Sequence, residues 1–138
     1  MNNFLELINI RKSFTTEKKI NVLRGLSRKF RLGKTYAIMG PSGSGKSTLL
    51  NLISLIDKPT SGTIKLDNLE INFNQNEKND LIRAKKLGIV YQENNLLADF
   101  TALENVYFAS LSLNNDKKLA LSKAVKLLKK VGLSNRLI

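Results

Sequence analysis

The segment from Gly40 to Thr48 reads Gly-Pro-Ser-Gly-Ser-Gly-Lys-Ser-Thr, so one glycine is followed, after four intervening residues, by Gly-Lys-Ser. This spacing is typical of a loop that binds phosphate groups. The apolar run at 35–39 predicts a buried parallel strand before the loop, and residues 49–56 predict a helix with a wide apolar face after it. Strand, glycine loop and helix in this order are the context that the motif requires.

The residue types of the loop explain why it suits phosphate. Glycine lacks a Cβ, so Gly43 and Gly45 allow positive φ and a close approach of the backbone. Successive N–H groups then form an anion nest at the start of a helix, where negative charge is favoured. Lys46 adds a full positive charge, and the hydroxyl of Ser47 is the expected magnesium ligand. The predicted phosphate-loop residues are Gly40, Pro41, Ser42, Gly43, Ser44, Gly45, Lys46, Ser47 and Thr48. A chance glycine-rich turn is the alternative, which the flanking strand and helix disfavour.

The composition limits what else the chain can do. Its 138 residues, 42% hydrophobic and 25% charged, fit one soluble globular domain over 1–138. It contains no cysteine and no histidine, which excludes disulfides, thiolate metal sites and the commonest general base. No apolar run approaches the ~20 residues that span a bilayer. Residues 1–6 also lack the features of a secretory signal, so we expect a cytoplasmic protein.

The patterning predicts an antiparallel β layer that leads into an α/β core. Strands are expected at 4–14, 20–23, 26–32, 63–66, 69–71 and 87–91, with a tight turn at 67–68. A helix is expected at 78–86, and a second should begin at Thr101, with Glu104 in capping-box spacing. A last helix, about 116–131, should end at Gly132. Its predicted apolar face consists of Leu121, Ala124, Val125, Leu128 and Val131.

In this order, the pieces resemble the nucleotide-binding subunit of an ATP-binding cassette transporter. The resemblance covers nearly the whole chain but only the first part of the family module. It is carried by the phosphate loop, by 12–14 with Phe14, by 88–92 with Gln92, and by the segment 95–106. The details look most like lipoprotein-release, macrolide-export and antimicrobial-peptide-export systems. The resemblance implies an α/β P-loop NTPase core with an N-terminal antiparallel β layer.

The family's site residues carry over to two further positions. The resemblance implies that Phe14 stacks on the adenine ring of ATP, although a plain core or strand-edge phenylalanine is the alternative. It implies that Gln92 reaches Mg²⁺ or the attacking water through its amide oxygen. The implied cofactors are ATP and Mg²⁺, held at the metal by Ser47 and Gln92. No catalytic residue beyond Gln92 is assigned.

The later elements of the family module do not occur in these 138 residues. They are a Leu-Ser-Gly-Gly signature, an apolar strand that ends in Asp with a catalytic Glu, and a switch histidine. We therefore expect weak binding of ATP or ADP with Mg²⁺ and little hydrolysis by the chain alone. A truncated subunit, a gene remnant and one half of a split module are all open interpretations.

The resemblance also implies partners: a membrane-embedded permease and a second ATPase subunit, as a homodimer in the intact module. The protein would then lie on the inner face of the cell membrane. In this family the membrane subunits choose the transported substrate, so this sequence does not identify it. A soluble cassette ATPase and a non-catalytic nucleotide-binding fragment are the alternatives. The net charge of +12 fits a solvated lysine face, or attraction to an anionic membrane surface. No nucleic acid partner is expected, because no row of aromatic residues is interleaved with the basic ones.

Overall fold

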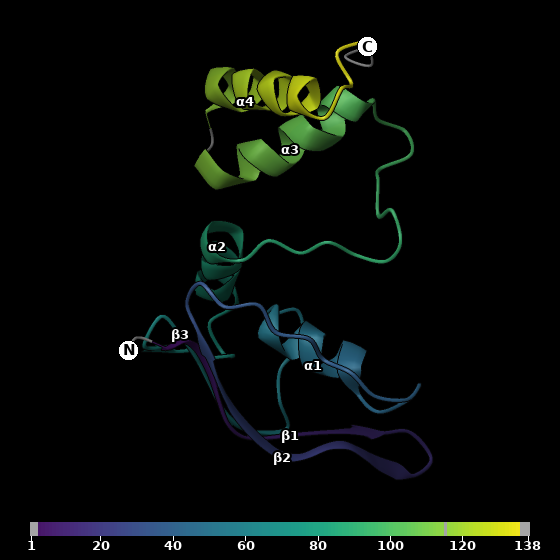
Figure 1. Ribbon diagram of the computed structural model, residues 1–138, viewed down its shortest axis with the longest axis vertical. Coiled ribbons are helices and arrows are strands. Elements are labelled where there is room, and N and C mark those ends of the chain that lie inside the picture. The colour runs from purple at the N-terminus through teal and green to yellow at the C-terminus, as the bar shows by residue number, and fades with distance from the viewer. Residues whose placement is uncertain (1–2, 115, 136–138) are drawn as a thin grey trace. The chain divides into compact units, whose positions relative to one another are not determined.

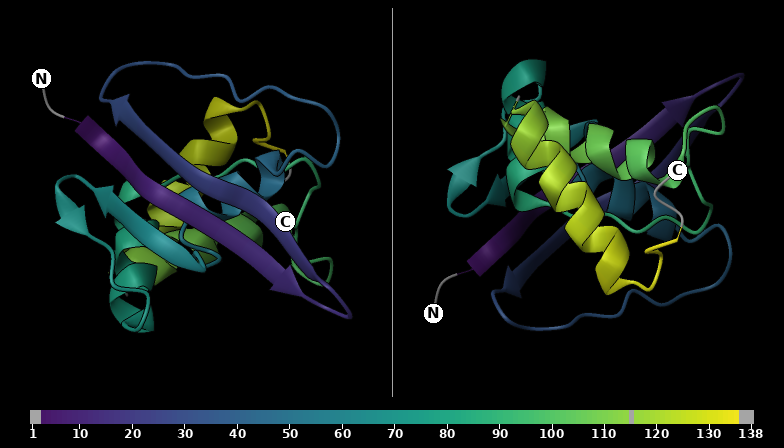
Figure 2. Two further views of the ribbon diagram at one scale, coloured as in Figure 1. Left: turned by 90° about the horizontal axis from the view of Figure 1, so that it is seen from below. Right: turned by 90° about the horizontal axis from the view of Figure 1, so that it is seen from above.

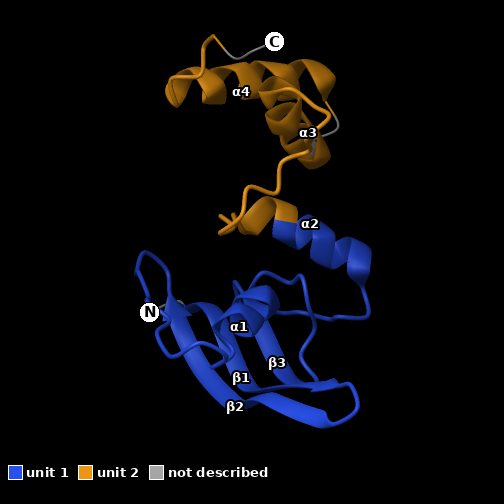
Figure 3. Ribbon diagram, turned by 90° about the vertical axis from the view of Figure 1, so that its right-hand side faces the viewer, with its two compact units in different colours: residues 1–83 blue, residues 84–138 orange. Residues whose placement is uncertain are grey.

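The computed structural model describes residues 3–114 and 116–135 and is shown in Figure 1. The chain forms two compact units, residues 1–83 and residues 84–138 (Figure 3). Each unit is described by itself below.

A four-stranded antiparallel sheet forms the framework of the first unit. Its strands are β1 (Asn3–Thr15), β2 (Lys19–Arg31), β3 (Ser61–Leu66) and β4 (Leu69–Glu70). Their order across the sheet is β2-β1-β3-β4. The long β1–β2 hairpin therefore has β2 at one edge, and β1 lies between β2 and β3. The predicted antiparallel layer at the start of the chain is confirmed.

The sequence predicted two strands at 20–23 and 26–32, and this prediction is wrong, because β2 runs through both without a break. Arg24 pairs with Arg11 and Leu26 pairs with Ile10, so the ladder continues on either side of Gly25. Gly25 takes φ +102°, and the ladder register shifts beside it. A glycine inside a strand commonly marks such an irregularity rather than an end.

The predicted tight turn between β3 and β4 is confirmed. Asp67 and Asn68 have φ values of +52° and +63°. Two successive residues with positive φ are typical of the two-residue hairpin turn whose twist matches that of the strands.

The helix α1 (Lys46–Ile53) lies over one face of the sheet, behind it in the left view of Figure 2. Leu49 and Leu52 of α1 are buried, and so is Leu55 just after its end. Burying such side chains stabilises a fold by roughly 1.5–3 kcal/mol each. The sheet contributes the rest of this core with Leu5, Leu7, Ile10, Ile64 and Leu66. The phosphate-loop helix is thereby fixed to the sheet.

Residues 35–39 and 87–91 belong to no strand, so the strands predicted there are wrong. Both are apolar runs of the kind that forms a buried central strand, which needs a paired neighbour. Within the described part of the chain neither run is paired with another strand. Met39 and Val90 are accordingly 88% and 99% exposed.

Three more helices follow the sheet along the chain. They are α2 (Asn76–Lys86), which contains the boundary between the units, α3 (Ala102–Asn114) and α4 (Lys117–Lys130). In the second unit α3 packs against α4. Among the described residues, none of the helices combines the length and apolar character that a membrane crossing needs.

The buried stripe of α4 differs from the predicted one. It consists of Ala120, Ala124 and Leu128, spaced four residues apart. Ala124 and Leu128 were predicted, but Leu121 and Val131 are exposed. Residues at i and i+4 lie above one another on a helix, and two alanines in this stripe allow a close approach of α3.

Both predicted ends of α4 are confirmed. The carboxylate of Asp116 accepts a hydrogen bond from the amide of Leu119 (3.0 Å), which is an N-cap. At the other end Gly132 has φ +78°. The amide of Gly132 donates to Lys129 O (3.2 Å) and that of Leu133 donates to Leu128 O (2.9 Å). These two bonds form the glycine-terminated Schellman cap.

The predicted capping box at the start of α3 is also confirmed, and it yields a testable pH dependence. The carboxylate of Glu104 accepts bonds from the amide (2.8 Å) and hydroxyl (2.9 Å) of Thr101. These bonds favour the ionised form and lower the pKa of Glu104. Its contribution to helix stability is therefore present above the ordinary glutamate pKa and is lost as the pH falls through the lowered value.

An NMR titration of the Glu104 carboxyl carbon measures this effect directly. We expect a midpoint below the ordinary value of a glutamate side chain. We also expect Thr101→Ala to move the midpoint upward. Equal midpoints in wild type and variant would contradict this role of Thr101.

Candidate functional site

The loop from Gly40 to Thr48 leads directly into α1. Gly43 and Gly45 have φ values of +78° and +90°, as predicted. The first helical hydrogen bond runs from the amide of Leu49 to Gly45 O (2.8 Å). Amides of the first turn that precede it have no partner within a helix. They are therefore available to an anion, and no acidic side chain lies in that turn to compete for them.

The ammonium group of Lys46 folds back over the loop. Its Nζ donates hydrogen bonds to Gly40 O (2.9 Å) and to Pro41 O (2.7 Å). Two neutral carbonyls are weaker partners for an ammonium than a charged oxygen is. Lys46 is thus held at the loop, with acceptors that a phosphate oxygen could replace.

The loop fits closely against β2 because its glycines have no side chains. A Cβ on Gly45 would lie 2.9 Å from Val22 Cγ1 and 3.3 Å from Leu23 Cδ2. A Cβ on Gly40 would lie 2.8 Å from Ser44 Oγ. A side chain at Gly45 would therefore push the loop away from the strand. The close approach of the backbone to a phosphate, which the glycine spacing predicted, stays a prediction.

Phe14 lies at the same end of the β1–β2 hairpin as the loop. It pairs with Ile20 near the hairpin turn, and Lys12 pairs with Leu23, the residue that Gly45 approaches. The ring of Phe14 is 42% exposed, which does not fit a core phenylalanine. A cavity of about 500 Å³ lies between the loop and β2, and Val22, Gly45 and Lys46 are among its lining residues.

Lys12 is the functional candidate that sequence reasoning passed over. Its side chain is only 10% exposed, and its Nζ lies 2.7 Å from each carboxylate oxygen of Asp57. It also donates to Lys58 O (2.9 Å) and lies 4.8 Å from the centroid of the Phe14 ring. Lys12 therefore joins β1 to the turn after α1 and covers one face of Phe14, which leaves the other face for a base.

A signal for this residue exists in the sequence. Leu5, Leu7 and Ile10 are the buried apolar residues of β1. Lys12 follows Ile10 with the period of two that places side chains on one face of a strand. A lysine on a buried face needs an acidic partner. The turn after α1 supplies that partner with Asp57.

The two predicted metal ligands lie in different units. Ser47 is exposed in the first turn of α1, and Gln92 is exposed in the second unit, in a segment without helix or strand. Their meeting at one Mg²⁺ stays a prediction. Within the described residues no group of three or more acidic side chains could hold a metal. Mg²⁺ is often bound through few protein groups together with nucleotide phosphates, so a single hydroxyl at Ser47 fits that chemistry.

Comparison with known proteins gives consistent results. The family described as "ABC transporter" matches residues 23–138. The chain is 42% identical over 134 residues to the "Lipoprotein-releasing system ATP-binding protein LolD" of Saccharophagus degradans, covering 96% of this chain and 59% of that protein. It is 43% identical over 137 residues to the LolD protein of Rickettsia felis, covering 99% and 60%.

Solved structures agree with these relatives. A dimeric post-hydrolysis state of the ATP-binding cassette MJ0796, bound to ADP and Pi, matches with TM-score 0.82 and 36% identity, over 91% of this chain and 56% of that one. A second dimeric structure of MJ0796 matches with TM-score 0.81. The predicted P-loop fold with its antiparallel layer is thereby confirmed. The chain spans about 60% of the length of the LolD proteins that it matches.

Proposed function

Because this chain belongs to the ABC transporter family, whose pattern matches residues 23–138, we propose that it is the ATP-binding part of a transporter's motor subunit. The observation that carries the proposal is the loop at 40–48. It has glycines in left-handed conformation, a lysine held over it, and the free start of a helix. These three features place positive charge and unpaired amides around one position, as the terminal phosphates of a nucleotide require.

Each candidate residue has a role in this proposal. The loop amides and Lys46 hold the β- and γ-phosphates, and Ser47 is the ligand that this loop offers to Mg²⁺. Phe14 stacks on the adenine ring with the face that Lys12 leaves open. Bound Mg²⁺ would neutralise charge on the phosphates. Gln92 is proposed to orient the attacking water or to bind Mg²⁺ from the second unit.

The whole protein is proposed to couple ATP hydrolysis to transport at a membrane, as a lipoprotein-releasing system does. The names of the LolD relatives support lipoproteins as the class of transported substrate. The dimeric MJ0796 structures support a second ATPase subunit as partner. A membrane-embedded permease would be the other partner, and the protein would lie on the inner face of that membrane.

Nucleotide binding is the step that the described residues support by themselves. Asp57, in the turn after α1, is engaged with Lys12 and is not a free base. Phosphoryl transfer depends on positioning and charge stabilisation by several groups. We therefore expect this chain to bind Mg-ATP and to release little phosphate, as a nucleotide-binding fragment would.

Thermal unfolding with different nucleotides tests the proposal. Mg-ATP and Mg-ADP at 100-fold over their dissociation constants should each stabilise the chain by about 2.7 kcal/mol. AMP, which lacks the phosphates that the loop would bind, should stabilise it much less at the same concentration. Equal effects of ATP and AMP would contradict a phosphate site, and steady phosphate release would contradict the limited role given to this chain.

A further inference from the structure

The lysines of α4 gather on the side of the helix that lies opposite its buried stripe. The helix contains six lysines and no acidic residue. With 3.6 residues per turn, five of these lysines point to one side, centred opposite Ala120, Ala124 and Leu128. These five, all exposed, are the lysine face: Lys118, Lys123, Lys126, Lys129 and Lys130.

The charge of the lysine face is largely uncompensated. Over residues 3–114 and 116–135, no carboxylate is paired with four of its members: Lys118, Lys126, Lys129 and Lys130. Asp116, at the start of the helix, is engaged as the N-cap. Lys126 has like charges three and four residues further on, and such pairs destabilise a helix. The stability of α4 therefore does not explain why its lysines share one side.

Apolar side chains are exposed on the same side of α4. Leu119 is exposed and is followed by Lys123, Lys126 and Lys130 at spacings of four, three and four residues, which align them along one side. A cavity of about 470 Å³ lies beside them, and its lining residues are Ser122, Val125, Lys126, Lys129 and Lys130. A lysine stem is itself apolar, so it can cover apolar surface while its ammonium group stays in a polar layer. The lysine face thus combines positive charge with apolar surface.

We propose that the lysine face of α4 binds a lipid surface with anionic headgroups. The inference rests on the proposed function, which locates the protein at a membrane. A lipid surface presents many negative charges in one plane, so lysines spread over roughly 18 Å of helix can each meet a different headgroup. The exposed Leu119 would enter the boundary between headgroups and acyl chains. Binding of this kind requires cations on one side of a helix and does not require a pocket around one anion.

A nucleic acid fits the same face less well. The helix contains no aromatic residue on which a base could stack and no arginine that could hold a phosphate through two parallel bonds. An exposed leucine among the lysines gains nothing from a phosphate backbone, whereas it gains from a lipid boundary.

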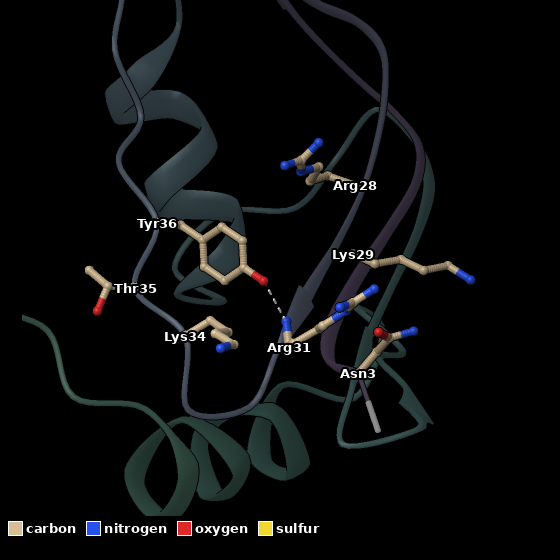
Figure 4. A pocket seen from close by; sticks show the side chains of 7 residues that line it. All are labelled: Asn3, Arg28, Lys29, Arg31, Lys34, Thr35 and Tyr36. Atoms are coloured by element: carbon tan, nitrogen blue, oxygen red, sulfur yellow. Dashed lines mark hydrogen bonds between the residues drawn. The ribbon is translucent and has the colours of Figure 1, made fainter. Parts of the chain in front are cut away.

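A second basic cluster, in the first unit, supplies a matched control. It lies around a cavity where β2 ends and the chain turns back, and Figure 4 shows its side chains. Arg28, Arg31 and Lys34 are exposed there, but Arg28 and Arg31 extend to opposite sides of β2. Replacing these three cations removes as much charge as replacing three lysines of α4, and it does so without changing one common surface.

Three variants of the full chain test the proposal. The face variant and the control variant are Lys126→Gln/Lys129→Gln/Lys130→Gln and Arg28→Gln/Arg31→Gln/Lys34→Gln. The rescue variant replaces the same three lysines of α4 by arginine, which keeps the charge. Glutamine and arginine are good helix formers, so α4 should remain folded, and circular dichroism checks this. If the face variant is not folded, Lys126→Gln alone decides: a loss of about threefold is expected, and no loss would overturn the proposal.

The measurement is sedimentation with vesicles in the absence of nucleotide. Wild type should bind vesicles that contain phosphatidylglycerol and should not bind vesicles of phosphatidylcholine alone. A lysine near an anionic surface contributes about fivefold to binding, so the face variant should lose about tenfold or more. The control variant should lose less than about threefold, because charges away from the bound face are screened by salt. The rescue variant should bind as wild type does.

Equal losses in the face and control variants, no binding to phosphatidylglycerol, or an equal loss in the rescue variant would overturn the proposal. Tighter binding of a thymidine oligonucleotide than of vesicles, with the same dependence on the three lysines, would assign the face to nucleic acid instead. Stabilisation by Mg-ATP is measured separately on each variant and should not change. Normal stabilisation by Mg-ATP without vesicle binding would overturn this proposal and leave the proposed nucleotide site intact.

Discussion

Lys46→Ala is expected to abolish the stabilisation of this chain by Mg-ATP. In the structure the Lys46 ammonium lies over the loop, bonded to Gly40 O and Pro41 O. At ~4 Å and an effective dielectric near 20, its attraction to one unit of phosphate charge is about 4 kcal/mol before desolvation costs. Even half of this value corresponds to a loss of more than tenfold in affinity. Calorimetric titration with Mg-ATP measures the change.

Lys126→Ala is the matched control for this variant. It removes one lysine from the exposed side of α4, in the other unit. Its affinity for Mg-ATP should equal that of wild type within experimental error. Without ligand, Lys46→Ala should unfold at nearly the wild-type temperature, because the bonds that Lys46 makes among the described residues go to carbonyls of its own loop. Unchanged affinity in Lys46→Ala would remove the basis of the transporter proposal.

Local signals in the sequence predicted much of the fold correctly. The turn at Asp67 and Asn68, the capping box of α3 and the glycine cap of α4 depend on residues close in sequence. Their backbone geometry is set by side chains within a few positions, so the local amino-acid sequence is sufficient to predict it. The glycine conformations of the phosphate loop were predicted for the same reason.

The failed predictions concern pairing between distant segments. An apolar run such as 35–39 indicates a strand only if a neighbour pairs with it, and its sequence does not say which segment that is. The same holds for α4, where contact with α3 decided which stripe is buried. Leu121 and Val131 are as apolar as Leu128, and only the placement of α3 distinguishes them.

In the candidate site, too, local patterns were predicted and contacts between distant residues were not. The loop residues and Phe14 were identified from motif and resemblance. The pairing of Lys12 with Asp57 joins residues 45 positions apart, so no local pattern shows it. That ion pair connects β1, which carries Phe14, to the turn after α1. We expect it to affect both the stability of the fold and the recognition of the adenine base.

Lys12→Met should lower the free energy of unfolding by about 2–3 kcal/mol. Methionine keeps the length of the side chain but leaves the Asp57 carboxylate without its partner. Removing one member of a fully buried ion pair costs about 3–5 kcal/mol. The loss here should be smaller because the Asp57 side chain is 32% exposed and keeps the amide of Lys58 as a donor (2.7 Å). Urea unfolding measures the difference.

The double variant Lys12→Met/Asp57→Leu separates charge from packing, since replacing both members of a buried pair by apolar residues is often nearly neutral. It should recover most of the stability that Lys12→Met loses. It should still bind Mg-ATP less well than wild type, because the ammonium that fixes one face of Phe14 is absent. Affinity for Mg-tripolyphosphate, which has no base, should be unchanged. A parallel fall for both ligands would show that Lys12 supports the loop rather than the adenine ring, and wild-type stability in Lys12→Met would show that the ion pair contributes nothing.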